Sequence, residues 1–456
     1  MGGEIARYRV GSGGDPSDSP HLGPFRGLAL TTGGDADGGD GQPNAGRDTA
    51  AVVAAQLTRD SYGRLLANLA ATSHDIAAAE DALADALEAA LVTWPQTGVP
   101  GNPTGWVFTV ARNRLRDLYR SSAHRTRAGD ASWWAEEREA VDTADMAPEP
   151  DEIGDKRLEL MFVCAHPAID AAVRAPLMLQ TVLGFTADRI ASAFAVPAST
   201  MAARLVRAKH RITAAGIPFV VPTRDRMASR LPAVLEAIYG TYAIDWQFVA
   251  GSTPRVSLAD EALYLATTLA HLLPREPEPL GLAALLAFSL SRSRAREIDG
   301  SLVPIDGQDT ALWDSALVAD AERLLARAHA LGSPVGRFQL EAAIQSVHAN
   351  RARSGFTDWQ ALRKLHLALV TIAPSLGAHV SLAAVIGQQD PREGLRMLDT
   401  LDGATQRFQP AWATRASLLA AAGEPSAHDA YRRAISLTTD TPSRRFLENA
   451  MARLDN

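Results

Sequence analysis

Arginine, aromatic and amide side chains gather between residues 106 and 130, where six arginines accompany two aspartates. Guanidinium groups neutralise phosphates, and aromatic rings stack on unpaired bases. Trp106, Asn113 and Tyr119 lie among the arginines, so the segment suits contact with phosphates and with unstacked bases. The other interpretation is an amphipathic helix whose arginines only face solvent.

A second basic segment has the order of a helix-turn-helix. The pattern predicts a short helix over 186–195 capped by Thr186, a tight turn over 196–198 and a longer helix over 199–212. At about 100° per residue, the longer helix has an apolar stripe and, roughly 90° away, a polar stripe. The apolar stripe is Met201, Leu205, Ala208 and Ile212, and the polar stripe is Thr200, Arg204, Arg207 and Arg211. A recognition helix in the major groove needs this layout, and a basic surface helix is the alternative.

An acidic helix precedes both basic segments. Residues 75–94 predict one long helix that ends before Pro95, with Leu83 and Trp94 in its apolar stripe. Its charged side chains are all carboxylates, namely Asp75, Glu80, Asp81, Asp85 and Glu88. This face is either a solvated surface or a docking surface for a basic partner.

Helices must carry all of these segments. From Val52 almost to the end, the sequence is Ala- and Leu-rich with helical spacing, and period-two alternation is nearly absent, so we expect an all-α protein. Residues 1–50 contain 13 glycines and few large apolar residues, which predicts a disordered tail. Breaks rich in proline, glycine or charge then divide the chain into 51–128, an acidic linker over 129–155, a block over 156–216, and 226–456.

The last of these segments contains one clear helix-pair repeat. Small residues over 411–420, followed by Ala427, Tyr431 and Ala434, fit a tetratricopeptide helix pair in which Tyr431 fills the space between the helices. Residues 376–386 and 391–401 fit an earlier, degenerate pair. The segment is either a concave surface for a peptide or protein, or a structural extension.

Composition and motifs exclude several classes of protein. The 456 residues carry 45 basic and 52 acidic side chains, so the net charge of −7 argues against a simple basic nucleic-acid binder. The single cysteine, Cys164, permits no intramolecular disulfide, fits a reducing cytoplasm and is interpreted as a core thiol. We find no signal peptide and no apolar stretch long enough to span a bilayer. Nucleotide-binding, zinc-protease and nucleophile motifs are also missing, so we expect no enzyme activity, no cofactor and no metal site.

Taken in order, these segments resemble a bacterial RNA polymerase sigma factor of the extracytoplasmic-function group. The resemblance is carried by the acidic helix, Ala-Arg-Asn-Arg-Leu after Trp106, the acidic linker, and Met-x-x-Arg-Leu-x-Arg-Ala-Lys after Thr200. Further segments resemble the subgroup with a long helical C-terminal extension of tetratricopeptide-like repeats, so that the resemblance covers about 56–456. These segments are 162–168, 216–219, 276–282, 306–309, 312–314 and 338–348.

The resemblance implies a fold and a set of contacts. The fold would be two small helical sigma domains, the second with the helix-turn-helix, followed by an α-solenoid-like repeat domain. The acidic helix would dock on the clamp helices of the polymerase β′ subunit through Glu80, Asp81, Asp85 and Glu88. The −10 element would be opened and read by Arg112, Asn113, Arg116, Tyr119 and Arg120. The −35 element would be read by Thr200, Arg204 and Arg207, with Lys209 and Arg211 on phosphates.

The implied function is promoter recognition and transcription initiation in the cytoplasm. The implied partners are core RNA polymerase, through its β′ clamp and β flap, promoter DNA, and an unknown protein or peptide at the repeat domain, with no membrane. The extension would take the place of a separate anti-sigma factor. Two other classes stay open: a helix-turn-helix transcriptional regulator with a repeat sensor domain, and a repeat scaffold with incidental basic helices.

Overall fold

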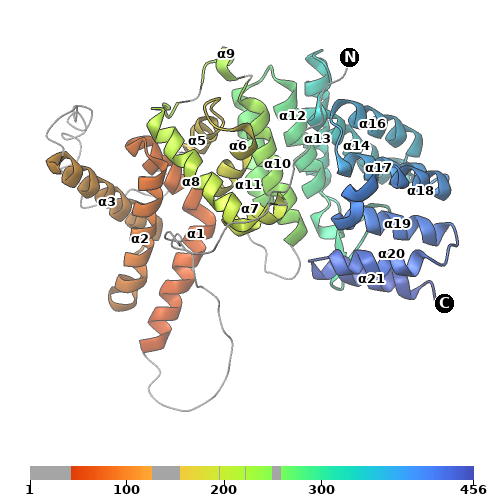
Figure 1. Cartoon of the computed structure of the whole chain (residues 1–456), viewed down its shortest axis with the longest axis horizontal. Helices are drawn as coiled ribbons and strands as arrows, with labels where there is room; N and C mark the ends of the chain where they lie inside the picture. Colours follow the sequence, from red (N-terminus) through yellow and green to blue (C-terminus); the bar gives the residue numbers. More distant parts are fainter. Residues whose placement is uncertain are drawn as a thin grey trace, which may run out of the picture.

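The computed structural model describes residues 43–125, 155–194, 196–220, 222–227, 229–248 and 258–455. In these residues the protein is all-α, as the sequence predicts (Figure 1). One antiparallel hairpin interrupts the helices, with Glu297 of β1 opposite Leu302 of β2. The elements are α1 Pro43–Ser73, α2 Ile76–Thr97, α3 Pro103–Arg125, α5 Arg157–Cys164, α6 Ala171–Thr181, α7 Ala187–Ala193, α8 Ala198–Ala214, α9 Arg224–Met227, α10 Leu231–Phe248, α11 Leu258–Leu272, α12 Pro277–Leu290, η3 Ser293–Ala295, β1 Glu297–Ile298, β2 Ser301–Leu302, η4 Ile305–Gly307, η5 Thr310–Leu312, α13 Ser315–Ala330, α14 Arg337–Ala349, α15 Arg351–Ser354, α16 Trp359–Ile372, α17 Leu376–Gly387, α18 Pro391–Asp399, η6 Asp402–Arg407, α19 Gln409–Ala421, α20 Ala427–Leu437 and α21 Thr441–Ala452.

The start of α1 differs from the expected boundary of the N-terminal tail. Residues 43–50 are helical instead of disordered, and Ala50 is fully buried. Proline suits the first helical position because its missing N–H would be unpaired there in any case, so Pro43 can open the helix. The rest of the expected tail, residues 1–42, lies outside the described residues.

The end of α2 also differs, since the helix continues through Pro95 to Thr97. A proline this close to the end removes only one helical hydrogen bond. The turn is closed by the N–H of Gly98, which donates to the carbonyl of Trp94 at 2.9 Å. The buried Trp94 ring packs edge-on against Trp106 of α3, with 5.5 Å between ring centroids, and this contact holds the last turn in place.

The predicted short helix, turn and longer helix are α7 and α8. The hydroxyl of Thr186 accepts a hydrogen bond from the N–H of Arg189 at 3.4 Å, which confirms the predicted cap. The predicted apolar stripe of α8 is entirely buried: Met201, Leu205, Ala208 and Ile212. α8 packs on α7, α6 and α2 (Figure 1).

One hydrophobic core joins the segments that the sequence divides. It runs from Ala50 in α1 to Ala349 in α14 and includes residues of α2, α3, α5–α8 and α10–α13. Val234, Leu235 and Ile238 of α10 are buried, and α10 packs on α6 as well as on α11 and α12. The first helices of the segment 226–456 therefore share a core with the segments before them. The expected acidic linker over 129–155 lies, apart from Asp155, outside the described residues.

Beyond α14, each helix packs mainly on its neighbours along the chain, and several small apolar clusters replace the single core (Figure 1). The two expected helix pairs are present as α17 with α18 and as α19 with α20. Tyr431 is buried in a cluster with Ala416 and Ala434, between the last helices. The final helix, α21, folds back onto β2. Among the helices described, none combines the length and the apolar character that crossing a bilayer requires.

The close crossing of α12 and α14 gives a test of the packing. A Cβ atom on Gly281 would lie 2.7 Å from the backbone nitrogen of Gln339, so Gly281→Ala must push the two helices apart. We expect it to lower the free energy of unfolding by about 2 kcal/mol, measured by urea denaturation. Gly377→Ala in α17 is the matched control, because a Cβ there meets nothing within 4 Å. The control should keep or slightly raise stability, and equal stability of both variants would contradict the close crossing.

Candidate functional site

Helix α2 lies between the two basic helices, because it packs on α3 on one side and on α8 on another (Figure 1). Leu83, Ala90 and Trp94 of its predicted apolar stripe are buried, whereas Leu87 is half-buried and Leu91, also expected in the stripe, is exposed. Asp81, Asp85 and Glu88 are exposed. None of these three carboxylates forms an ion pair with another residue of the described segments. They form an acidic surface, which we call the α2 acidic face.

Glu80 does not belong to this face. Its carboxylate is largely buried and pairs with the ammonium group of Lys209 in α8. Lys209 itself is only 8% exposed. The two residues were expected to contact two different partners, the polymerase and a DNA phosphate. In this structure they contact each other, so the ion pair must break before Lys209 can contact a DNA phosphate or Glu80 can pair with the polymerase.

The electrostatic surroundings of Glu80 are unfavourable to its charge. Burial raises the pKa of its carboxyl group, and the nearby Lys209 only partly opposes this shift. Partial burial and the neighbouring Asp85 likewise raise the pKa of the otherwise exposed Asp81. Desolvation raises the pKa of the half-buried Tyr62 in α1, and the nearby carboxylates of Glu80 and Asp81 raise it further. The contact of α2 with α8 therefore concentrates negative charge that Lys209 balances only in part.

Four of the expected contact residues of α3 are at least partly exposed, and the fifth, Tyr119, is hydrogen-bonded to α1. Asn113 and Arg120 are exposed, and Arg112 and Arg116 are half-buried. The hydroxyl of Tyr119 donates to the carbonyl of Ser73 at 3.3 Å, which ties the ring to the end of α1. Burial is also the main cause of the raised pKa of Tyr119. The arginines and Asn113 are thus placed for external contacts, whereas Tyr119 must break a hydrogen bond before it can stack on a base.

The polar stripe of α8 lies beside the buried stripe, as the helical spacing predicts. Arg207 and Arg211 are exposed, and Thr200 and Arg204 are half-buried. Within the described segments, none of the three arginines forms an ion pair. Lys209 lies on the other flank of the buried stripe, turned toward α2. The helical spacing thus separates Lys209 from the arginines with which it was grouped.

Cys164 lies in the core, as expected. It is fully buried, its sulfur is 3.6 Å from the hydroxyl of Thr181, and burial raises the pKa of the thiol to about 12. His166 accepts a hydrogen bond from the N–H of Ala168 instead of pairing with the thiol. In the residues described, no group of three or more potential ligands is arranged to hold a metal ion.

Comparison with known proteins places the chain among its relatives. Residues 230–329 match a family of unknown function (DUF6596). An uncharacterized protein of Rhizobium meliloti (strain 1021) is 33% identical to this chain over 377 residues, which are 81% of this chain and 88% of the relative. The chain belongs to the same family as this relative. No solved structure matches the chain significantly.

The segment that matches DUF6596 runs from α10 to nearly the end of α13 and contains contacts that the sequence did not predict. Glu278 at the start of α12 accepts hydrogen bonds from the backbone N–H groups of Phe338 and Gln339 at 3.0 and 3.2 Å, and so caps α14. The same segment contains Arg292 and Arg296, which line a pocket. The run of arginines at 292–296 was the only signal for this pocket in the sequence.

Proposed function

We propose that this protein is a bacterial sigma factor that binds core RNA polymerase and directs promoter recognition and transcription initiation. The observation that carries the proposal is the α2 acidic face, whose three exposed carboxylates have no ionic partner in the described segments and lie between two basic helices. A promoter-binding helix-turn-helix alone would not need this face. The order of acidic and basic segments along the chain also supports the proposal.

In the proposed complex, each charged surface has a separate role. Asp81, Asp85 and Glu88 dock on a basic surface of the polymerase, since exposed charges of opposite sign steer and orient association. Arg112, Asn113, Arg116 and Arg120 contact the −10 element. Thr200, Arg204, Arg207 and Arg211 contact the −35 element, where base and phosphate contacts both favour arginine. Lys209 and Glu80 instead hold α8 against α2 until the two helices separate.

The C-terminal helices complete the proposed arrangement. We assign α14 to α21 as an α-solenoid-like array of tetratricopeptide-like helix pairs that regulates or supports the activity of the first two domains. Its support is the packing of each helix on its neighbours along the chain and the small apolar clusters, which differ from the single core that extends from α1 into α14. Residues of α14 belong to the core that begins in α1, so this array packs against the same core as the proposed promoter-binding helices.

Transcription in vitro tests the proposal. The full-length protein, added to purified core polymerase and its own genomic upstream fragments, should produce new discrete transcripts. Asp81→Arg/Asp85→Arg should reduce them at least about tenfold, because reversing two docking charges costs more than roughly 1.4 kcal/mol of binding free energy. Asp60→Arg/Glu448→Arg, which makes the same charge change at exposed sites on α1 and α21, should leave transcription unchanged.

Other outcomes lead to other functions. A specific footprint on duplex DNA without polymerase, and no transcripts, would make the protein a helix-turn-helix transcriptional regulator. Absence of both polymerase and DNA binding would favour a repeat scaffold. Equal loss of transcripts in both charge-reversed variants would overturn the assignment of the docking surface to α2.

A further inference from the structure

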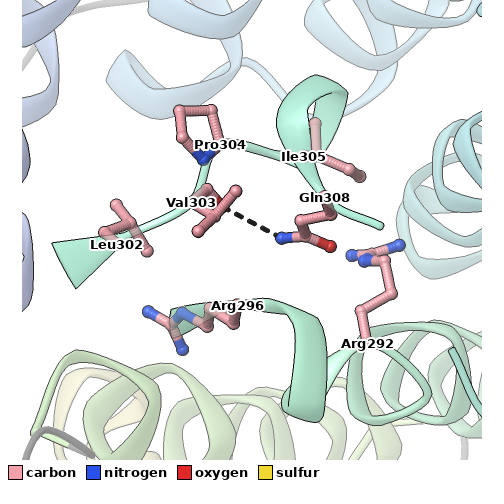
Figure 2. Close-up of a pocket in the computed structure, with 7 residues that line it drawn as sticks. All are labelled: Arg292, Arg296, Leu302, Val303, Pro304, Ile305 and Gln308. Atoms are coloured by element: carbon pink, nitrogen blue, oxygen red, sulfur yellow. Dashed lines mark hydrogen bonds between the residues drawn. The ribbon is translucent and has the colours of Figure 1, made fainter. Parts of the chain in front are cut away.

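A pocket of about 250 Å³ lies between the end of α12 and the loop that follows β2 (Figure 2). One wall carries Arg292 and Arg296, on either side of η3. The other wall is the loop from Leu302 to Gln308, which contributes apolar side chains and one carboxamide. The volume is below the range of about 300–1,000 Å³ typical of sites for drug-sized ligands, so the pocket suits a small molecule.

Arg292 is a buried cation with unused hydrogen-bonding capacity. It is 7% exposed, and its Nη2 donates to Oε1 of Gln345 at 2.6 Å. Its Nη1 is buried and has no hydrogen-bond partner within the described segments. A buried guanidinium group is costly unless an anion or several acceptors compensate its charge.

The charges around Arg292 add to this cost. Burial, with smaller contributions from the neighbouring Arg296 and Arg351, lowers the pKa of Arg292 to about 10, and among the described residues Tyr242 acts in the opposite direction. Arg296 differs, since Asp440 and Glu297 offset part of the effect of burial on its pKa. The pocket is therefore a cationic environment in which no carboxylate of the described residues pairs with Arg292.

The opposite wall holds its one polar side chain in a fixed orientation. The Nε2 of Gln308 donates to the carbonyl of Val303 at 3.1 Å, and its buried Oε1, which faces the pocket, has no hydrogen-bond partner among the residues that the structure describes. Figure 2 shows the carboxamide of Gln308 turned toward the guanidinium of Arg292. Arg351 fixes the loop by donating to the carbonyls of Ile305 and Gln308, each at 2.8 Å, while it lies over the Trp313 ring.

We propose that this pocket binds a small molecule that carries a carboxylate or phosphate group together with a hydrogen-bond donor. The anionic oxygens accept from Nη1 of Arg292 and from Arg296, because a guanidinium forms strong charge-assisted hydrogen bonds with both groups. The donor of the ligand meets Oε1 of Gln308. Binding thus satisfies both unpartnered buried atoms at once. The inference concerns a site remote from α2 and α8 and does not rest on the proposed function.

The pocket adjoins the hairpin on which the last helix of the chain packs. The hairpin that adjoins the pocket packs against α21, and a Cβ on Gly300 would collide with Arg445 of that helix. A ligand bound between Arg292 and the loop after β2 would therefore stabilise the hairpin and, through it, the packing of α21.

Isothermal titration calorimetry of the full-length protein tests the site, with inorganic phosphate and malonate as probes at constant ionic strength. We expect saturable binding of at least one probe at one site, with a Kd at or below about 1 mM. Binding of phosphate alone would identify a phosphorylated ligand, and binding of malonate alone would identify a carboxylate. Arg292→Gln and Arg296→Gln should each raise the Kd about tenfold or more.

Arg294→Gln is the matched control, because Arg294 lies in η3 between the two pocket arginines but is exposed. It should bind as the unmodified protein does. If Arg292→Gln fails to fold, the affinity of Arg296→Gln, a variant at a half-buried position, still tests the site. The inference is overturned if neither probe binds saturably, or if Arg296→Gln and Arg294→Gln bind with the same affinity as the unmodified protein.

Discussion

Lys209→Met should lower the free energy of unfolding by about 3 kcal/mol at neutral pH, although methionine is apolar and similar in length to lysine. The substitution leaves the carboxylate of Glu80 largely buried and without its cation. Breaking a buried ion pair from one side costs about 3–5 kcal/mol, and the partial exposure of Glu80 places the effect at the lower end. Urea denaturation followed by circular dichroism measures it.

The pH dependence of this effect is a second readout. Burial already raises the folded-state pKa of Glu80, and loss of Lys209 raises it further. A carboxyl group with a raised pKa contributes stability below its unfolded pKa, and this contribution is lost as pH rises through the folded pKa. The deficit of Lys209→Met should therefore be larger at pH 8 than at pH 5.

Two variants separate the buried pair from the alternative role of Lys209. Glu80→Gln/Lys209→Met should recover much of the lost stability, because neither of these two positions then carries a buried charge. Arg207→Met makes the same substitution of a cation on the exposed side of α8 and should change stability by less than about 0.5 kcal/mol. If Lys209→Met is as stable as Arg207→Met but binds promoter DNA more weakly than the unmodified protein does, Lys209 is a phosphate contact and its ion pair with Glu80 is incidental.

Acid should destabilise the protein strongly through two histidines on packed helices. Burial lowers the pKa of His348 in α14 and of His366 in α16 to about 4, and Arg292, His366 and Arg351 contribute to the shift of His348. In the unfolded chain a histidine titrates near 6.5, so the unfolded state binds more protons between pH 6.5 and 4. Each histidine then contributes stability that is complete above about pH 6.5 and falls by roughly 3 kcal/mol as the pH approaches 4.

The measurement is the free energy of unfolding at pH 7.5, 6.0 and 5.0. His348→Gln/His366→Gln should flatten the decline between pH 7.5 and 5.0 compared with the unmodified protein. His329→Gln, at an exposed position of α13, controls for loss of a histidine and should retain the steep decline. Identical pH profiles for the double variant and the unmodified protein would show that both histidines stay accessible to protons.

Local patterns in the sequence determined much of the helical structure. The cap at Thr186, the buried stripe of α8 and the pairs α17–α18 and α19–α20 were all predictable, because a cap or an amphipathic stripe depends on residues within a few turns of one another. The exposed positions of Arg207 and Arg211 follow from the same helical spacing. The expected roles of these residues in promoter recognition remain predictions.

Tertiary contacts decided the features that spacing does not encode. Helix α2 continues beyond Pro95, where Trp94 packs on Trp106 of α3. Residues of α10 belong to the same core as the helices before the predicted boundary at 216–226. The acidic Glu80 and the basic Lys209 lie 129 residues apart, so no local pattern could pair them. Likewise, the unpartnered Nη1 of Arg292 becomes visible only when a loop and a helix end enclose it. The sequence determined which side chains each helix presents, whereas burial and partner choice depended on how distant helices meet, since removal from water is a property of the assembled fold.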